Sequence, residues 1–278
     1  MKLFKMKLPT GWYPTNAEAC RIEIQSFLAG FSHNFKASLG GITPHAGWDY
    51  SGRLAARVFS ILANNNPNPD AVCIVGGHLA SYHPVLFLDM DEAQTPLGNI
   101  SINQNLTQKI IKNLKDTVED PNEGDNTIEV LLPMVKYFFP QSPLISFRAP
   151  TSTLAKELGD TIAKVAQEEN LNILVIASAD LTHYGPNYNF IDHGIGEEAL
   201  HWVKMTNDKE IVDFMLLGDI NGVLKHGKDQ SSTCSSGAIA TALAFGKKNQ
   251  FSPSLVEYHT SYDIYASTSF VGYSGIVF

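Results

Sequence analysis

Three near-continuous apolar runs constrain the fold of this chain more than any other feature. They cover residues 71–75, 144–147 and 172–177, and Gly and Pro residues bound such runs along most of the chain. A strand with one solvated face alternates polar and apolar residues, whereas an unbroken apolar run is typical of a strand covered on both faces. The sequence therefore predicts a central sheet whose middle strands are buried between two layers.

Helical periodicity lies between these runs. Leu54, Val58, Ile61 and Leu62 recur at helical spacing, and a second helix is expected over 154–165. The order is therefore strand, helix, strand, helix. This alternation favours an α/β single-domain sandwich, with a mixed, largely buried central sheet flanked by helices.

The whole chain, residues 1–278, is expected to form this one domain. Its 278 residues can bury a sizeable core, and no Gly/Ser linker, low-complexity tract or internal repeat divides them. The last segment, 270–278, is rich in aromatic and β-branched residues. It predicts a closing strand that ties the end of the chain into the sheet.

Charge and cysteine usage narrow the partners and the compartment. A formal net charge of -8, with scattered Lys and Arg, predicts no nucleic-acid partner and favours a small molecule or a protein. No stretch approaches the roughly 20 apolar residues of a membrane span, and the first residues lack the apolar run of a signal peptide. Three cysteines at unrelated spacings do not form a disulfide framework. We expect a reducing, cytoplasmic location and no membrane association.

Three short glycine-flanked motifs carry the donors of a candidate metal site. His45 lies in Pro-His-Ala-Gly, His78 follows a glycine pair directly after an apolar run, and Cys234 precedes a helix of small residues over 235–246, which Gly246 is expected to end. Imidazole and thiolate are borderline or soft ligands. A packed scaffold could bring these three together as a mononuclear site.

Each of these donors also has an alternative interpretation. A lone His45 or His78 could be a structural loop histidine. The start of a helix stabilises a thiolate at Cys234, which could otherwise be an inert thiol like those expected at Cys20 and Cys73. Only the combination of motifs favours a metal.

Further polar residues are candidates for acid–base chemistry and for the pocket. Asp180 and His183 follow the strongest apolar run and could hold or transfer a proton; alternatively, Asp180 caps the following turn and His183 is structural. Asp49 and Tyr50 could orient a ligand or contact a substrate, and could equally cap a helix that begins near Ser51.

Together, these motifs resemble the MEMO family, which includes the B component of the bacterial AmmeMemoRadiSam gene system. The resemblance runs from Pro-His-Ala-Gly at 44–47 to Val-Gly-Tyr at 271–273. It implies a fold like that of class III extradiol ring-cleaving dioxygenases. The positions that it assigns to the site are His45, His78 and Cys234 as metal ligands, with Asp180 and His183 nearby.

The third ligand sets the chemistry that the resemblance implies. The dioxygenases use two histidines and a carboxylate, so Cys234 stands where a hard oxygen donor would be. The set suits a divalent or soft transition metal, with Fe(II) favoured and Cu or Zn as alternatives. Many family members have Glu-His-Ser-x-Glu where this chain reads Asp-Asn-Thr-Ile-Glu at 125–129. Asn126 therefore offers an amide in place of an imidazole, and Glu129 is either a pocket residue or structural.

Two function classes follow. In the first, the metal-bearing pocket binds a small molecule or a protein partner, and other AmmeMemoRadiSam components are candidates by association. In the second, the protein is a metal-dependent oxidoreductase of dioxygenase type or a metal-assisted hydrolase, in which His183 transfers a proton and Asp180 orients it. The first class is favoured, because a thiolate is oxidisable and changes the charge at the metal.

Overall fold

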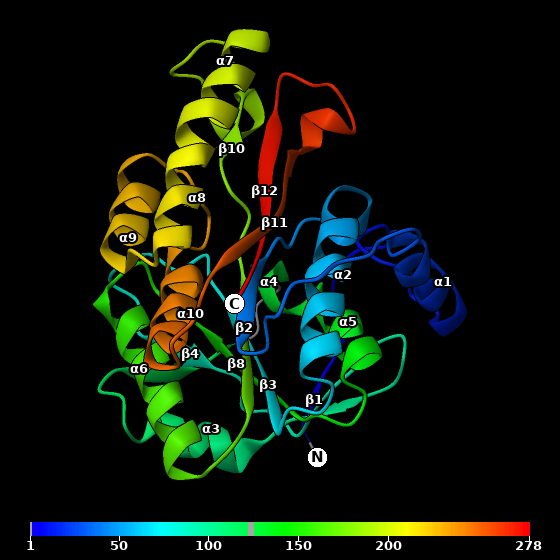
Figure 1. The fold of residues 1–278 in the computed structure, drawn as a ribbon, viewed down its shortest axis with the longest axis vertical. Coiled ribbons are helices and arrows are strands. Elements are labelled where there is room, and N and C mark those ends of the chain that lie inside the picture. Colours follow the sequence, from blue (N-terminus) through cyan, green and yellow to red (C-terminus); the bar gives the residue numbers. More distant parts are fainter. Residues whose placement is uncertain (1, 122–124) are drawn as a thin grey trace.

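The computed structural model describes residues 2–121 and 125–278, which form an α/β sandwich with helices on both faces of a mixed sheet (Figure 1). The described strands of the main sheet, in spatial order, are β10 (His183–Tyr184), β12 (Phe270–Val277), β2 (Gly40–Thr43), β9 (Ile173–Ser178), β3 (Ala71–Gly76), β8 (Leu144–Arg148), β4 (Val85–Phe87) and β7 (Thr117–Glu119), with β11 (Ser254–Thr260) paired to β12.

The centre of this sheet is parallel, and the strand on each side of this centre runs in the opposite direction. β2, β9, β3 and β8 run in one direction, whereas β12 pairs with β2, and β4 with β8, in the opposite sense. The predicted buried strands, including the closing strand, are confirmed as β3, β8, β9 and β12. Every residue of β3, β9 and β12 is buried, as the unbroken apolar runs predict for β3 and β9.

Alternate side chains of the central strands enter two separate cores. In β3, Cys73 and Val75 pack in one core while Val72 and Ile74 pack in the other. The first core contains α3 (Gln104–Ile111), α6 (Thr153–Glu168) and α10 (Ser236–Lys248), and the second contains α1 (Ala17–Phe27), α2 (Trp48–Asn65) and α5 (Leu132–Phe138). These two helical layers stand on either side of the sheet in Figure 1.

The remaining elements complete the described structure. A small sheet joins β1 (Leu3–Phe4), β5 (Glu92–Ala93) and β6 (Ile100–Ser101). The other described elements are α4 (Asn126–Glu129), the 3₁₀ turns η1 (Pro186–Tyr188) and η3 (Ser261–Asp263), α7 (Glu197–Trp202), the π-helix η2 (Val203–Asn207), α8 (Asp208–Leu217) and α9 (Ile220–Asp229).

Two predicted helix boundaries are wrong. Gly246 does not end α10, which continues to Lys248; a Cβ at Gly246 would lie 2.7 Å from Phe251, so this glycine permits close packing inside the helix. The second helix of the chain begins at Trp48, with Gly47 as its N-cap, and not near Ser51. Asp49 and Tyr50 are therefore in its first turn and cannot be its caps.

Within the described ranges, no helix combines the length and the apolar character needed to cross a membrane.

Candidate metal centre

The candidate site lies at the carboxyl ends of neighbouring parallel strands. His45 follows β2, Asp180 follows β9, His78 follows β3 and Arg148 is the last residue of β8. Since β2, β9, β3 and β8 are adjacent in that order, their exits deliver these side chains to one edge of the sheet. This is the edge at which open α/β sheets bind ligands.

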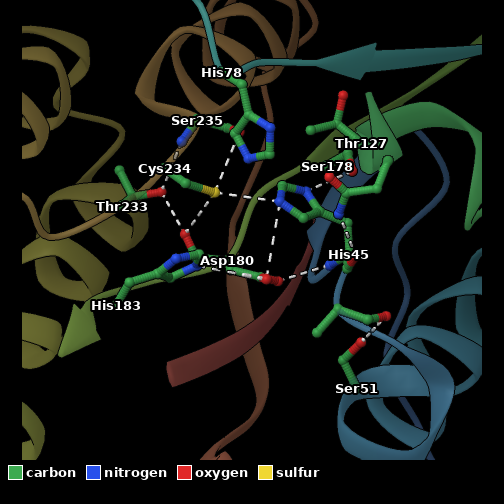
Figure 2. Close-up of polar contacts among 12 residues, drawn as sticks. His45, Ser51, His78, Thr127, Ser178, Asp180, His183, Thr233, Cys234 and Ser235 are labelled. Atoms are coloured by element: carbon green, nitrogen blue, oxygen red, sulfur yellow. Dashed lines mark hydrogen bonds and ion pairs between the residues drawn. The ribbon is translucent and has the colours of Figure 1, made fainter. Parts of the chain in front are cut away.

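His45 is the most deeply buried of the three predicted donors, at 1% exposure. Its Nδ1 lies 2.9 Å from Ser178 Oγ, and its backbone N–H donates to Asp180 Oδ1 at 2.7 Å. These contacts fix the ring so that Nε2 points to Cys234 Sγ, 3.2 Å away. In Figure 2 the Ser178 contact lies on the side of the ring opposite the sulfur. Nε2 is therefore the nitrogen available to a metal.

His78 approaches the same sulfur from the end of β3. Its Nδ1 lies 2.9 Å from Asp125 Oδ2, and the same oxygen accepts a hydrogen bond from Arg148 Nη2 at 3.1 Å. Asp125 also caps α4 by accepting from the backbone N–H of Thr127. The ring orientation of His78 is thus set by a carboxylate that is itself held in place.

The backbone at His78 is unusual. Its φ angle is 58°, a left-handed conformation that costs a non-glycine residue free energy and persists where surrounding structure imposes it. The two preceding glycines permit close approach: a Cβ at Gly76 would lie 2.1 Å from Thr127 Oγ1, and one at Gly77 would lie 2.4 Å from Ser235. The glycine pair therefore brings α4 and the start of α10 against the exit of β3.

Cys234 completes the group from the loop before α10. Its backbone N–H donates to Asp180 O at 3.3 Å, and its sulfur lies 3.4 Å from Ser235 Oγ. His45, His78 and Cys234 each offer one ligand atom, and these atoms all lie within 4.8 Å of one another. The structure thus brings together the three residues that the sequence nominated.

Electrostatics at this cluster favour a thiolate among imidazolium rings when no metal is bound. Burial opposes ionisation of Cys234, but His45, His183 and His78 outweigh it and hold the pKa of the thiol well below its usual range. Burial also opposes protonation of His78, yet Asp125 and Cys234 raise the pKa of this imidazole to about 10. Such charge complementarity is typical of a functional site.

His183 and Asp180 lie beside this cluster. Burial disfavours the charged form of His183, but Asp180 and Cys234 raise the pKa of the ring to about 10. Its Nε2 lies 3.7 Å from Asp180 Oδ2, and this buried nitrogen has no hydrogen-bond partner among the described residues. Figure 2 shows the ring of His183 approaching the cluster from the side opposite His78.

A cavity of about 680 Å³ opens onto His45, His78, Asp180 and His183. Its wall combines aromatic rings with hydroxyl groups and contains no Lys or Arg among the described residues. The aromatic residues of the wall are Trp12, Tyr50, Tyr188, Tyr265 and Tyr273, and its hydroxyl residues include Thr10, Ser261, Ser267 and Ser269.

A second cavity, of about 600 Å³, reaches the cluster from another side. Cys234 lines this cavity, and His183 and Tyr188 line both. The rings of His183 and Tyr188 lie 5.0 Å apart and form a shared wall. The sulfur and the imidazoles therefore face different openings.

The other predicted pocket residues lie at different distances from the cluster. Tyr50 and Asn126 line the first cavity, and Asn126 Nδ2 donates to His45 O at 3.0 Å. Asp49 is exposed and lies outside the cavity wall. The buried Glu129 also lies outside it and accepts from the backbone N–H groups of Lys7 and Leu8 and from the hydroxyl of Tyr13, so it holds the N-terminal segment in place.

Sequence reasoning missed the residues that orient the ligands. Ser178 and Arg148 carry no motif of their own, and Asp125 lies in the 125–129 segment without having been assigned a role. Ser178 and Arg148 are the last residues of β9 and β8, at the edge where the donors gather, and Asp125 precedes the altered Asn126. For Ser178 and Arg148, position at a strand exit was the only signal available; for Asp125 the signal was its place in the 125–129 segment.

The fold and the cluster define an α/β protein with a candidate mononuclear metal centre, and comparison with known proteins gives its family. The model of the Memo-like protein family matches residues 5–277, so the chain belongs to this family.

Curated relatives agree with this family, and a solved structure shares the fold. A MEMO1 family protein of Methanosarcina acetivorans is 29% identical over 273 residues, which cover 96% of this chain and 95% of the relative. One from Pyrobaculum aerophilum is 30% identical over 87% of this chain and 83% of the relative. An uncharacterized protein from Escherichia coli K12 shares the fold at a TM-score of 0.52 and 16% identity, over 78% of this chain and 91% of that chain.

The lowered pKa of Cys234 predicts selective alkylation. In metal-free protein at pH 6, iodoacetamide should label Cys234 and leave Cys20 and Cys73 unmodified. Both of these thiols are buried, and burial raises the pKa of Cys20 to about 12 and that of Cys73 further. Peptide mass spectrometry measures the labelling. A Cys234 rate that rises only near pH 8.5, the range of an ordinary thiol, would show that the neighbouring imidazoles do not stabilise the thiolate.

Proposed function

We propose that this protein holds one transition-metal ion through His45 Nε2, His78 Nε2 and Cys234 Sγ, and binds a small molecule beside it. The observation that carries this proposal is the arrangement of the two imidazoles. Ser178 and Asp125 occupy the Nδ1 atoms, which leaves both Nε2 atoms directed to the cluster. Protein ligands to metals typically have their second ring nitrogen bonded in this way.

The donor set fits a borderline or soft metal. Two imidazoles and one thiolate suit Fe(II), the ion that we favour, as well as Cu and Zn. When bound, such an ion supplies Lewis acidity and, for iron or copper, one-electron chemistry. With His45, His78 and Cys234 as its three protein donors, such a metal would have a further coordination position for a ligand.

Removal of any one donor should abolish metal retention at this site. Purified without oxygen, the protein should contain about one metal ion per chain by elemental analysis, and His45→Ala, His78→Ala and Cys234→Ala should each contain almost none, because three donors must converge. Ser178→Ala should weaken affinity roughly 10–100-fold, since it only orients His45. His33→Ala is a matched control, since His33 contacts Asn64 near the C-terminal end of α2, whereas the cluster lies near the start of this helix. Full metal content in Cys234→Ala would remove the thiolate from the site.

The cavity wall indicates the chemistry of the small molecule. Aromatic walls favour a flat ring that can stack on them, and the serine hydroxyls offer hydrogen bonds to neutral polar groups. The Cys234 thiolate and the Asp180 carboxylate would oppose the positive charge of a divalent ion and of the protonated His183 ring. The described wall has no Lys or Arg, and beside the metal donors its cationic side chain is His183, whose Nε2 lies 3.7 Å from Asp180 Oδ2. An anionic group would have to compete with Asp180 for that ring. We therefore favour a neutral aromatic ligand.

A matched pair of compounds tests this preference. Calorimetry on Zn(II)-loaded protein should detect binding of 4-hydroxybenzamide, which is neutral, and roughly tenfold weaker binding of 4-hydroxybenzoate, which is charged, because the carboxylate loses hydration and the nearest cationic ring, His183, already faces Asp180. Tyr265→Ala should weaken the amide roughly threefold by removing one stacking surface. Tyr82→Ala is the control, since Tyr82 is an exposed ring outside the cavity. Tighter binding of the benzoate would contradict the neutral-ligand assignment.

His183 favours a second candidate function, proton transfer in a metal-assisted oxidation or hydrolysis. Its Nε2 is buried, has no hydrogen-bond partner among the described residues and belongs to a ring that lines the ligand cavity. A general acid or base needs a nitrogen free to reach the reacting group. Asp180 Oδ2, 3.7 Å away, stabilises the protonated ring by its charge.

An oxygen-consumption assay distinguishes this catalytic function from ligand binding alone. Anaerobically Fe(II)-loaded protein should consume no oxygen with catechol and form no coloured ring-opened product, because the thiolate replaces the carboxylate of the dioxygenases. Oxygen electrode and absorbance measurements decide this. His183→Gln should keep its full metal content, since it acts beyond the ligands. Ring opening by the wild-type protein that is lost in both His45→Ala and His183→Gln would establish catalysis.

A further inference from the structure

A π-helical turn precedes two buried polar residues that no motif singled out. In η2, the backbone N–H of Asp208 donates to Val203 O, five residues earlier, as a π-turn requires. The turn ends at Asn207, and Asn207 and Asp208 are 1% and 0% exposed. Because π-turns are rare and often occur at functional sites, the contacts of these two side chains are informative.

The Asp208 carboxylate binds the loop that carries His183. Oδ1 accepts hydrogen bonds from the backbone N–H of Thr182, at 3.1 Å, and from the Thr182 hydroxyl. Oδ2 accepts from the Tyr258 hydroxyl at 2.8 Å. Gly272 leaves space for this carboxylate, because a Cβ there would lie 1.9 Å from Oδ2.

Burial of the Asp208 carboxylate costs free energy, which its hydrogen-bond partners must offset. Desolvation raises the pKa of Asp208 to about 7, although the donors from Thr182 and Tyr258 oppose the rise. A buried polar group is stable only when its hydrogen bonds are satisfied. The carboxylate therefore holds Thr182, the residue before His183, in one position.

Asn207 connects this loop to the one that carries Cys234. Its Nδ2 donates to Thr182 Oγ1 at 3.0 Å and to Gln230 O at 3.1 Å. Gln230 begins the loop 230–235 that leads to Cys234. A single side-chain amide thus joins two loops that lie far apart in sequence and meet at the candidate centre.

We propose that Asn207 and Asp208 are positioning residues that lock the His183 loop and the Cys234 loop together, so that the imidazole and the thiolate are in place before metal or ligand binds. The roles of Cys234 and His183 in this inference rest on the proposed function. The lock itself rests on Thr182, whose hydroxyl both donates to Asp208 and accepts from Asn207. Loss of this hydroxyl should loosen both loops at once.

The test compares Thr182→Val with Thr182→Ser. Valine has the shape of threonine without the hydroxyl, whereas serine retains it. We expect Thr182→Val to weaken Co(II) binding roughly tenfold, the loss typical for a residue that orients ligands. Thr182→Ser, which keeps the hydroxyl, should bind Co(II) with the wild-type affinity. The absorption band of thiolate-bound Co(II) measures the affinity.

A second readout needs no metal. In metal-free Thr182→Val, amide hydrogen exchange should accelerate in both loops, 181–185 and 230–235, and remain unchanged in β3 and β9. Asn66→Ala is the matched control. Asn66 is a buried amide that donates to Ser38 O and Asn172 Oδ1. These partners precede β2 and β9, at the ends of the strands that face away from the candidate centre. Its loss should lower the melting temperature without changing Co(II) affinity or exchange in the two loops.

The outcomes separate this inference from the proposed function. If the wild-type protein takes up no Co(II), the metal proposal fails, and amide exchange alone decides whether the two loops are locked together. Faster exchange in the 181–185 loop but not in 230–235 would overturn the lock. So would an equal loss of Co(II) affinity in Thr182→Val and Asn66→Ala, since the effect would then follow general stability.

Discussion

The candidate centre depends on one constraint, the shared direction of β2, β9, β3 and β8. Parallel strands that lie side by side end at the same edge, so the residues that follow them are neighbours although they are far apart in sequence. His45, Asp180 and His78 reach the cluster for this reason alone. The fourth contribution, Cys234, comes from a helix start, and it can approach only because Gly77 leaves room for Ser235 at the exit of β3. Sheet direction and one close backbone approach together determine the site.

Around this edge, several residues adopt energetically costly arrangements that fix the orientation of side chains. His78 adopts a left-handed backbone conformation, Asp208 is a fully buried carboxylate, and Asp125 is held between His78 and Arg148. Each arrangement costs free energy unless neighbouring groups impose or satisfy it. Buried hydrogen bonds near the proposed ligands are also directional: those of Ser178 and Asp125 select which nitrogen of each imidazole faces the sulfur. Such arrangements are typical of sites that must be formed before a ligand arrives.

Strands and candidate ligands that depend on local patterns could be predicted from the sequence. Roles that depend on contacts with residues distant in the sequence could not. Unbroken apolar runs are a local signal of strands covered on both faces, so β3, β8 and β9 could be predicted. His45, His78 and Cys234 stood at strand exits and a helix start, and the structure brings them together. Gly246 misled because a glycine that ends a helix and one that accommodates a neighbouring ring look alike in sequence; only the approach of Phe251 distinguishes them. Glu129 and Asp208 depend on long-range partners, Tyr13 and Thr182, which no spacing reveals.

The two openings bear on how the site can be used. The first cavity presents His45, His78, Asp180 and aromatic rings, whereas the second presents Cys234, and the rings of His183 and Tyr188 lie between them. A molecule that fills the first cavity would meet imidazole and carboxylate groups before the sulfur. The thiolate would then serve mainly as a metal ligand and would be shielded from that molecule, which favours binding over direct thiol chemistry. His183 borders both openings, so it is the residue best placed to respond to a ligand in the first cavity and to alter the environment of the sulfur in the second.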